Sequence, residues 1–166
     1  MKPSVNKRLE KATFGAGSFW ELEEALRTVP GVVHTEVGYM GGHAPNPTHQ
    51  EVCSGRTGHA EVVQVTFDPQ QVSYDQLLQV FWRSHDPTHT DSLGNAIGSP
   101  YRSVVFFHHN EQRLMAETTK ENWQQSPEFS GRQIMTAILP ADTLYRAEEY
   151  HQQYLLKRGE AGCRTN

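Results

Sequence analysis

Alternating apolar and polar positions predict the clearest strand of the chain at residues 61–68. Val63, Val65 and Phe67 fall on one face of this strand together with Glu61, because successive side chains of a strand point to opposite faces. We expect that apolar face to point into the core. Short apolar runs predict further strands at residues 11–14, 32–40, 102–108 and 134–139.

Helical periodicity separates these strands. Leu22, Leu26 and Val29 share one face of a helix predicted over residues 19–29. Ser73 and Gln76 form a capping box at the start of a helix predicted to end near residue 85. Two more helices are predicted at residues 111–125 and 146–157.

The first six elements therefore run strand, helix, strand, strand, helix, strand. This order predicts an α+β fold: a ferredoxin-like split βαβ sheet with helices packed on it, followed by a C-terminal helix. We expect residues 1–157 to form a single catalytic domain and residues 158–166 to form a mobile tail that carries Cys163, because the tail is glycine-containing and has no apolar run. The long polar loop at residues 86–100 is predicted to border the functional site.

Charge and composition exclude several classes of partner. The chain has 19 acidic and 15 basic residues and a net charge of −4, with no basic stripe, so no nucleic acid is expected. No apolar run approaches the ~18 residues of a membrane span, and the N-terminal segment lacks the apolar stretch of a signal peptide. We therefore expect a cytoplasmic protein that does not bind membranes.

Two cysteines, Cys53 and Cys163, are too few for a disulfide scaffold, and they form no CxxC pair. Cys53 is predicted to be a small buried residue and not a redox centre. The histidines also lack a zinc signature. The best candidate group matches no known ligand spacing, and Pro87 interrupts any helix that would align it; its members are His85, Asp86, His89 and Asp91. No metal site is expected.

Ser18 follows the glycine-rich segment 15–17 and opens the first predicted helix. One interpretation is an N-cap, with Glu21 completing a capping box. The other is the position of a nucleophile, because helix N-terminal N–H groups and the helix dipole stabilise a thiolate there. A serine hydroxyl gains far less from this environment without a base beside it, and the segment is not a GxSxG elbow, so a serine hydrolase fits poorly.

Phe19 and Trp20 are adjacent aromatics with two interpretations: both are partly buried core residues, or they form an apolar wall for a small substrate group next to residue 18. Glu61 also has two. At the rim of an apolar face, burial would raise the pKa of its carboxyl and make it a general acid. Alternatively, it is an exposed carboxylate paired with Arg56 or Arg102.

Several separated motifs resemble, in the correct order, those of the peptide methionine sulfoxide reductase A family over nearly the whole chain. The family pattern Gly-Cys-Phe-Trp is present as Gly17-Ser18-Phe19-Trp20. The other matching segments are VGYMGG at 37–42, NPT at 46–48, EVCSG at 51–55, TGHAEVV at 57–63, FW at 81–82, HDP at 85–87, YRS at 101–103 and YHQQYL at 150–155.

This resemblance implies reduction of methionine S-sulfoxide, free or in oxidised peptides and proteins. A cysteine at position 18 would attack the sulfoxide sulfur while Glu61 protonates the oxygen, which gives methionine and a cysteine sulfenic acid. Cys163 would then form a disulfide that thioredoxin or another dithiol reduces, without a bound cofactor. Phe19 and Trp20 would hold the substrate methyl group, and Tyr101 would help to position the oxygen.

The chain departs from the family pattern at three positions. His49 stands in the substrate-binding site where the family usually has tyrosine, and Gly94-Asn95-Ala96 lacks the usual aspartate. Ser18 replaces the essential cysteine, so the chain as written is expected to be inactive. Two explanations of Ser18 are open. An engineered cysteine-to-serine change is favoured, because the rest of the motif and Cys163 are retained; the alternative is a natural protein that binds methionine sulfoxide without catalysis.

Overall fold

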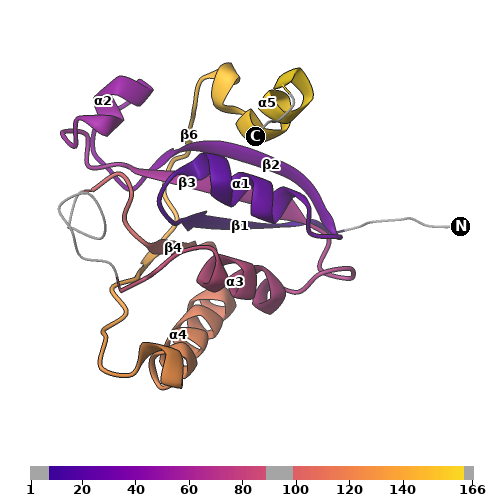
Figure 1. Ribbon diagram of the computed structural model, residues 1–166, viewed down its shortest axis with the longest axis vertical. Helices are drawn as coiled ribbons and strands as arrows, with labels where there is room; N and C mark the ends of the chain where they lie inside the picture. The colour runs from indigo at the N-terminus through magenta and orange to yellow at the C-terminus, as the bar shows by residue number, and fades with distance from the viewer. Residues whose placement is uncertain (1–7, 89–98, 163–166) are drawn as a thin grey trace, which may run out of the picture.

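The computed structural model describes residues 8–88 and 99–162, and places a six-stranded sheet at the centre of the molecule (Figure 1). The strands are β1 (Glu10–Gly15), β2 (Val32–Met40), β3 (Ala60–Phe67), β4 (Val104–Phe107), β5 (Ala137–Pro140) and β6 (Tyr145–Arg146). The helices are α1 (Phe19–Arg27), α2 (His49–Cys53), α3 (Tyr74–Arg83), α4 (Asn110–Gln124) and α5 (Tyr154–Gly162), with two 3₁₀ turns, η1 (Pro127–Phe129) and η2 (Glu149–His151).

The strand order β5-β4-β1-β3-β2-β6 contains the ferredoxin-like sheet. Its four central strands, β4-β1-β3-β2, pair with one another in antiparallel fashion. Strand β5 extends the sheet parallel to β4, and β6 pairs antiparallel with β2. The predicted α+β fold, with helices packed on its sheet, is confirmed. The capping box of Ser73 and Gln76 at the start of α3 is confirmed as well.

The largest differences from the sequence prediction lie in the C-terminal third. The strand expected at 134–139 starts only at Ala137, and the helix expected at 146–157 is instead β6, η2 and α5. Gln153 separates the last two because its φ of 53° lies outside the helical region. Helix α5 continues to Gly162, five residues beyond the helix end expected at residue 157. Cys163 and the Gly94-Asn95-Ala96 segment lie outside the described residues.

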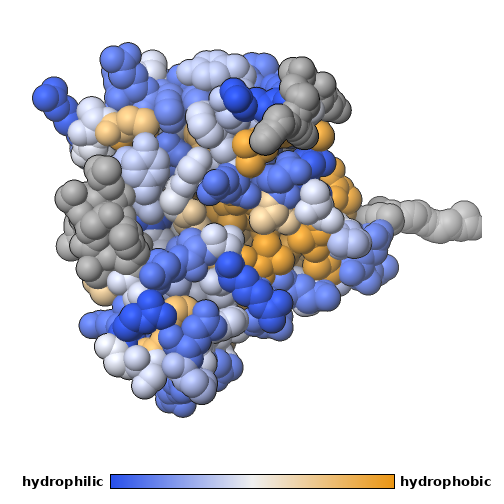
Figure 2. All heavy atoms as spheres, in the orientation of Figure 1, coloured by the Kyte–Doolittle hydropathy of each residue, from blue (hydrophilic) through white to orange (hydrophobic). Residues whose placement is uncertain are grey.

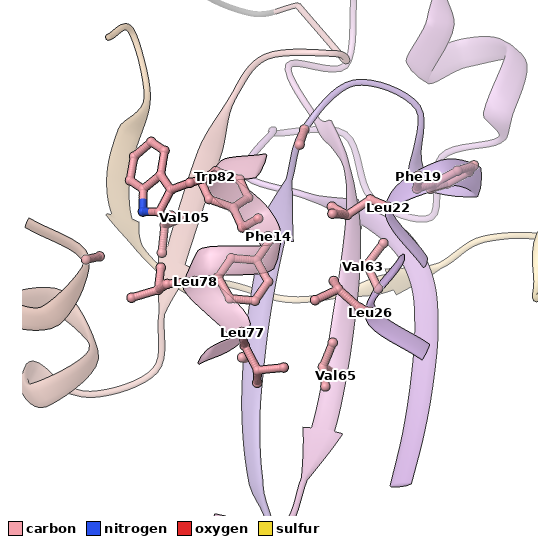
Figure 3. Packing of buried hydrophobic residues seen from close by; sticks show 14 of the residues in the cluster. Phe14, Phe19, Leu22, Leu26, Val63, Val65, Leu77, Leu78, Trp82 and Val105 are labelled. Atoms are coloured by element: carbon pink, nitrogen blue, oxygen red, sulfur yellow. The ribbon is translucent and has the colours of Figure 1, made fainter. Parts of the chain in front are cut away.

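One face of the sheet is covered by α1 and α3, and the main hydrophobic core lies between them and the strands (Figure 3). Leu22 and Leu26 of α1 and Leu77 of α3 are buried against Phe14 of β1 and Val63 of β3. The apolar face predicted for β3 therefore does point into the core. On the outside, Figure 2 shows mostly hydrophilic surface over α2 and α4, with apolar side chains gathered between α1 and α3.

The opposite face of the sheet is buried too. Val62 of β3 belongs to a second apolar cluster, against which Ala141 and Leu144 pack. The segment 141–144 thus crosses this face on its way from β5 at one edge of the sheet to β6 at the other. Gly38 permits the close pairing at that edge, because a Cβ there would lie 2.5 Å from the carbonyl oxygen of Tyr145. This crossing carries the C-terminal residues to the end of the sheet where α1 begins.

Candidate active site

The N-terminus of α1 is the centre of the candidate site. Gly17 has a φ of +78°, a conformation that favours glycine, and it turns the chain from β1 into the helix. Ser18 is the N-cap, as one interpretation predicted, and its hydroxyl accepts the Trp20 N–H at 3.2 Å. The predicted capping box with Glu21 is wrong, because the hydroxyl bonds to the second helical N–H and not the third. Among the described residues no imidazole or carboxylate contacts the Ser18 hydroxyl, so none of them serves it as a base.

Glu61, the second residue of β3, lies directly beside this helix N-terminus. Its side chain is 2% exposed, and Oε1 accepts the Phe19 N–H at 3.2 Å. That N–H is one of the helix donors without an intrahelical partner. Burial raises the pKa of the Glu61 carboxyl, and the contacts with Phe19 and His49 only partly offset this rise. The alternative of an exposed pair with an arginine is not what forms: the Arg102 guanidinium donates to the backbone carbonyls of Ser99 and Gly58.

Phe19 and Trp20 occupy different environments. Phe19 is buried in the core, whereas Trp20 is only partly buried. The Trp20 Nε1–H donates to His151 Nδ1 at 3.0 Å, and its indole stacks on Tyr154 with 3.8 Å between ring centroids. The Phe19 and His151 rings lie 5.3 Å apart. Trp20 and Tyr154 therefore present ring surface next to residue 18, while Phe19 and His151 are buried behind them. Sequence reasoning missed His151 and Tyr154, although both lie in the YHQQYL motif.

The other side of the site comes from α2 and the segment before β4. His49 Nε2 lies 3.1 Å from Glu61 Oε2 and 3.4 Å from Cys53 Sγ. The Tyr101 hydroxyl lies 3.4 Å from the same sulfur. The bond to Cys53 and burial raise the pKa of Tyr101, so its hydroxyl stays protonated and can donate to a substrate oxygen. The prediction that Cys53 is buried is wrong: it is exposed on a short helix that faces the site.

Glu148 fixes the position of α2 and was not identified from the sequence. Its Oε1 accepts the Tyr39 hydroxyl at 2.8 Å, and its Oε2 accepts the His49 backbone N–H at 3.0 Å. Burial opposes ionisation of this carboxyl, but the hydrogen bonds from His49 and Tyr39 outweigh it and lower the pKa of Glu148. An ionised Glu148 therefore connects β2, α2 and the C-terminal segment at the site.

Of the candidate metal-binding group around His85, the structure describes only His85 and Asp86. His85 contacts Ser103 Oγ at 2.7 Å and the Phe81 carbonyl at 2.9 Å, and burial lowers its pKa to about 4. His89 and Asp91 lie outside the described residues. His85 is therefore a structural residue that joins α3 to the start of β4, and it takes no part in the site at Ser18.

The fold and the site together define an α+β protein with Ser18 at a helix N-terminus and the buried carboxyl of Glu61 bonded to the same helix end. The family model described as peptide methionine sulfoxide reductase matches residues 10–166. The chain belongs to this family of enzymes.

Two kinds of relative support the assignment. Peptide methionine sulfoxide reductase MsrA of Methanoculleus marisnigri is 61% identical over 159 residues, which cover 96% of each chain. Methionine sulfoxide reductase A of Corynebacterium diphtheriae has a similar structure, with a TM-score of 0.82 and 39% identity over 90% of this chain and 74% of that one. Mxr1 of Saccharomyces cerevisiae in complex with Trx2 gives a TM-score of 0.62 and 25% identity over 92% and 89% of the two chains. None of the helices in the described ranges is long and apolar enough to cross a membrane.

Proposed function

We propose that the site of this chain serves the reduction of methionine S-sulfoxide, free or within oxidised peptides and proteins, and that Ser18 stops the reaction after substrate binding. The observation that carries this proposal is the buried Glu61 carboxyl bonded to the first N–H of α1, next to residue 18. A protonated carboxyl at that place is a general acid beside the position of the nucleophile.

Each neighbouring group suits one part of the substrate. The partly exposed Trp20 ring accommodates the methyl group of the sulfoxide, with the buried Phe19 ring supporting it from the core, and the Tyr101 hydroxyl donates to the sulfoxide oxygen. His49, in contact with Glu61, adds a second polar group on the oxygen side. Glu61 delivers the proton that makes the oxygen easier to remove from sulfur.

A cysteine at position 18 completes the reaction. Its thiolate attacks the sulfoxide sulfur, and the oxygen ends on the cysteine as a sulfenic acid while methionine leaves. Cys163 then displaces water from the sulfenic acid and forms a disulfide, which a dithiol reduces by exchange. The complex of yeast Mxr1 with Trx2 supports thioredoxin as that dithiol. The reaction needs no bound cofactor, and it suits repair of oxidised proteins in the reducing cytoplasm.

Serine cannot replace this thiolate because its hydroxyl stays protonated in the absence of a base. The chain as written should therefore bind methionine S-sulfoxide without consuming it. Calorimetric titration with a peptide containing methionine S-sulfoxide tests this, with the R epimer and the unoxidised peptide as matched controls. Binding of the S epimer well above both controls is the expected result. Equal affinity for all three peptides would contradict the proposal.

A further inference from the structure

Three side chains of the site offer a second kind of chemistry. His49, Cys53 and Glu61 each present one metal-ligating atom, and these three atoms lie within 4.8 Å of one another. An imidazole nitrogen, a thiolate sulfur and a carboxylate oxygen are the donors that Zn²⁺ takes from proteins. We propose that His49 Nε2, Cys53 Sγ and Glu61 Oε2 form a binding site for Zn²⁺ or a similar borderline-soft divalent ion.

The distances between the three donor atoms suit a tetrahedral ion. With metal–ligand bonds of about 2.0–2.3 Å, two ligands of a tetrahedral Zn²⁺ lie about 3.3–3.8 Å apart. The separations here are 3.1 Å from His49 Nε2 to Glu61 Oε2, 3.4 Å from Cys53 Sγ to the same nitrogen, and 4.0 Å from that sulfur to Oε2. Shifts of a few tenths of an ångström would bring all three into coordination range.

The local structure keeps the donors in place. His49 and Cys53 are four residues apart on α2, a spacing that puts both side chains on one face of the helix. Glu61 is fixed on β3 by the Phe19 N–H, which bonds its other oxygen and leaves Oε2 for the ion. Such a supporting bond orients a ligand in the way that outer contacts do in known metal sites.

The described residues supply three donors to this cluster, which leaves a fourth position for water or a substrate, as in catalytic zinc sites. The Tyr101 hydroxyl, 3.4 Å from Cys53 Sγ, is placed to contact a water bound there. A bound ion would ionise the Cys53 thiol and occupy the Glu61 carboxylate, so it would remove the proton needed for sulfoxide chemistry. Metal occupancy and sulfoxide reduction would then exclude each other at this site.

The proposed metal site depends on His49, whose imidazole supplies one of its three ligands. The resemblance to the family implies tyrosine at this position, and zinc takes its protein ligands from cysteine, histidine and carboxylates rather than phenols. The competing explanation is a hydrogen-bond network alone, in which the His49 Nε2–H donates to Glu61 and Cys53 is a bystander. The two explanations differ in what a divalent ion does to the Cys53 sulfur.

The experiment is a titration of the complete reduced chain with Co²⁺, which reports thiolate ligation by a charge-transfer band, followed by competition with Zn²⁺. One equivalent should bind. Cys53→Ser should abolish the thiolate band, and His49→Tyr should weaken binding about 10-fold or more. Cys163→Ser is the matched control for the second thiol, and it should change neither the thiolate band nor the metal affinity. A band that survives Cys53→Ser, or is lost in Cys163→Ser, would overturn the proposal.

A measurement on the unsubstituted chain guards against misfolded variants. Zn²⁺ should slow alkylation of Cys53 by iodoacetamide, while Cys163 in the same molecule reacts at an unchanged rate. Equal labelling of Cys53 with and without Zn²⁺ would also refute the site. Neither assay involves sulfoxide turnover, so their failure would leave the proposed reductase chemistry untouched.

Discussion

His49 Nε2 and Glu61 Oε2 lie 3.1 Å apart, and this contact joins the short helix α2 to the central strand β3. The ionisation of Glu61 therefore affects both the proton available at the site and the attachment of α2. Its other oxygen is bonded to the N-terminus of α1. The Glu61 carboxyl thus contacts both helices that line the site, α1 and α2.

Replacing Ser18 by cysteine should convert the chain from no measurable reduction of methionine S-sulfoxide to clear turnover with a dithiol. The reason is that a cysteine thiol at the N-terminus of α1 ionises near neutral pH, whereas a serine hydroxyl there stays protonated. Methionine formation measured by chromatography tests this, with Ser18→Ala as the control that preserves the fold and gains nothing. Substantial turnover by the serine form, free of contaminating reductase, would show that residue 18 is not the nucleophile.

In the Ser18→Cys protein, Glu61→Gln should slow the reductase step by about 10²–10⁴-fold, the usual contribution of a general acid. Substrate binding should weaken less, because the amide keeps the shape of the side chain and can still donate a hydrogen bond. Single-turnover kinetics separate the two effects. An undiminished rate in the glutamine variant would mean that the proton comes from another group.

The raised pKa of Glu61 also predicts a pH dependence. The acid acts when protonated, so the reductase rate should fall as the pH rises through this pKa, and Glu61→Gln should remove that limb of the profile. The free energy of unfolding that Glu61 contributes should also fall as the pH rises. Because the folded state holds the proton more tightly than the unfolded chain, the contribution of Glu61 is complete below its unfolded pKa and is lost as the pH rises through the folded one. Urea denaturation at several pH values should show a flatter dependence for Glu61→Gln than for the parent chain.

Glu148→Gln should destabilise the fold by about 1 kcal/mol or more, because an amide has only one oxygen for the two donors of Tyr39 and His49. The pKa of Glu148 is lowered, so its contribution is present above the unfolded pKa and disappears as the pH falls through the folded one. The matched control is Glu149→Gln, since the carboxylate of this exposed neighbour forms a surface pair with Arg146. Similar urea midpoints for the two variants would contradict the role assigned to Glu148.

Cys163 is predicted to resolve the oxidised cysteine of the Ser18→Cys protein. One equivalent of sulfoxide should join residue 18 to Cys163 in a disulfide found by peptide mapping. Adding Cys163→Ser should leave the first turnover intact and abolish repeated turnover with thioredoxin. The position of Cys53 in the site makes it the natural competitor. A mapped disulfide to Cys53, or normal cycling without Cys163, would show that the assignment is wrong.

The sequence predicted those parts of the structure that depend on neighbouring residues. The alternation in β3 placed Glu61 at the end of a buried face, and the glycine-rich turn placed residue 18 at a helix N-terminus. Ser73 and Gln76 marked the start of α3 through a contact between residues three apart.

Contacts between distant residues could not be predicted in this way. The bond from Tyr39 to Glu148 joins residues 109 positions apart, and that from Trp20 to His151 joins residues 131 apart. Neither leaves a periodic signal in the chain. The exposure of Cys53 was missed for a related reason: its surroundings depend on how a five-residue helix is attached to β2 and η2, and not on the helix itself.

The late position of Glu148, His151 and Tyr154 has a consequence for the newly made protein. A chain emerging from the ribosome presents its N-terminal elements first. It can assemble β1, α1, β2, β3, α3 and β4 while those three residues are still unsynthesised. Nascent chains that end before residue 148 should therefore fold much of the sheet and yet lack the groups that anchor α2 and pack against Trp20.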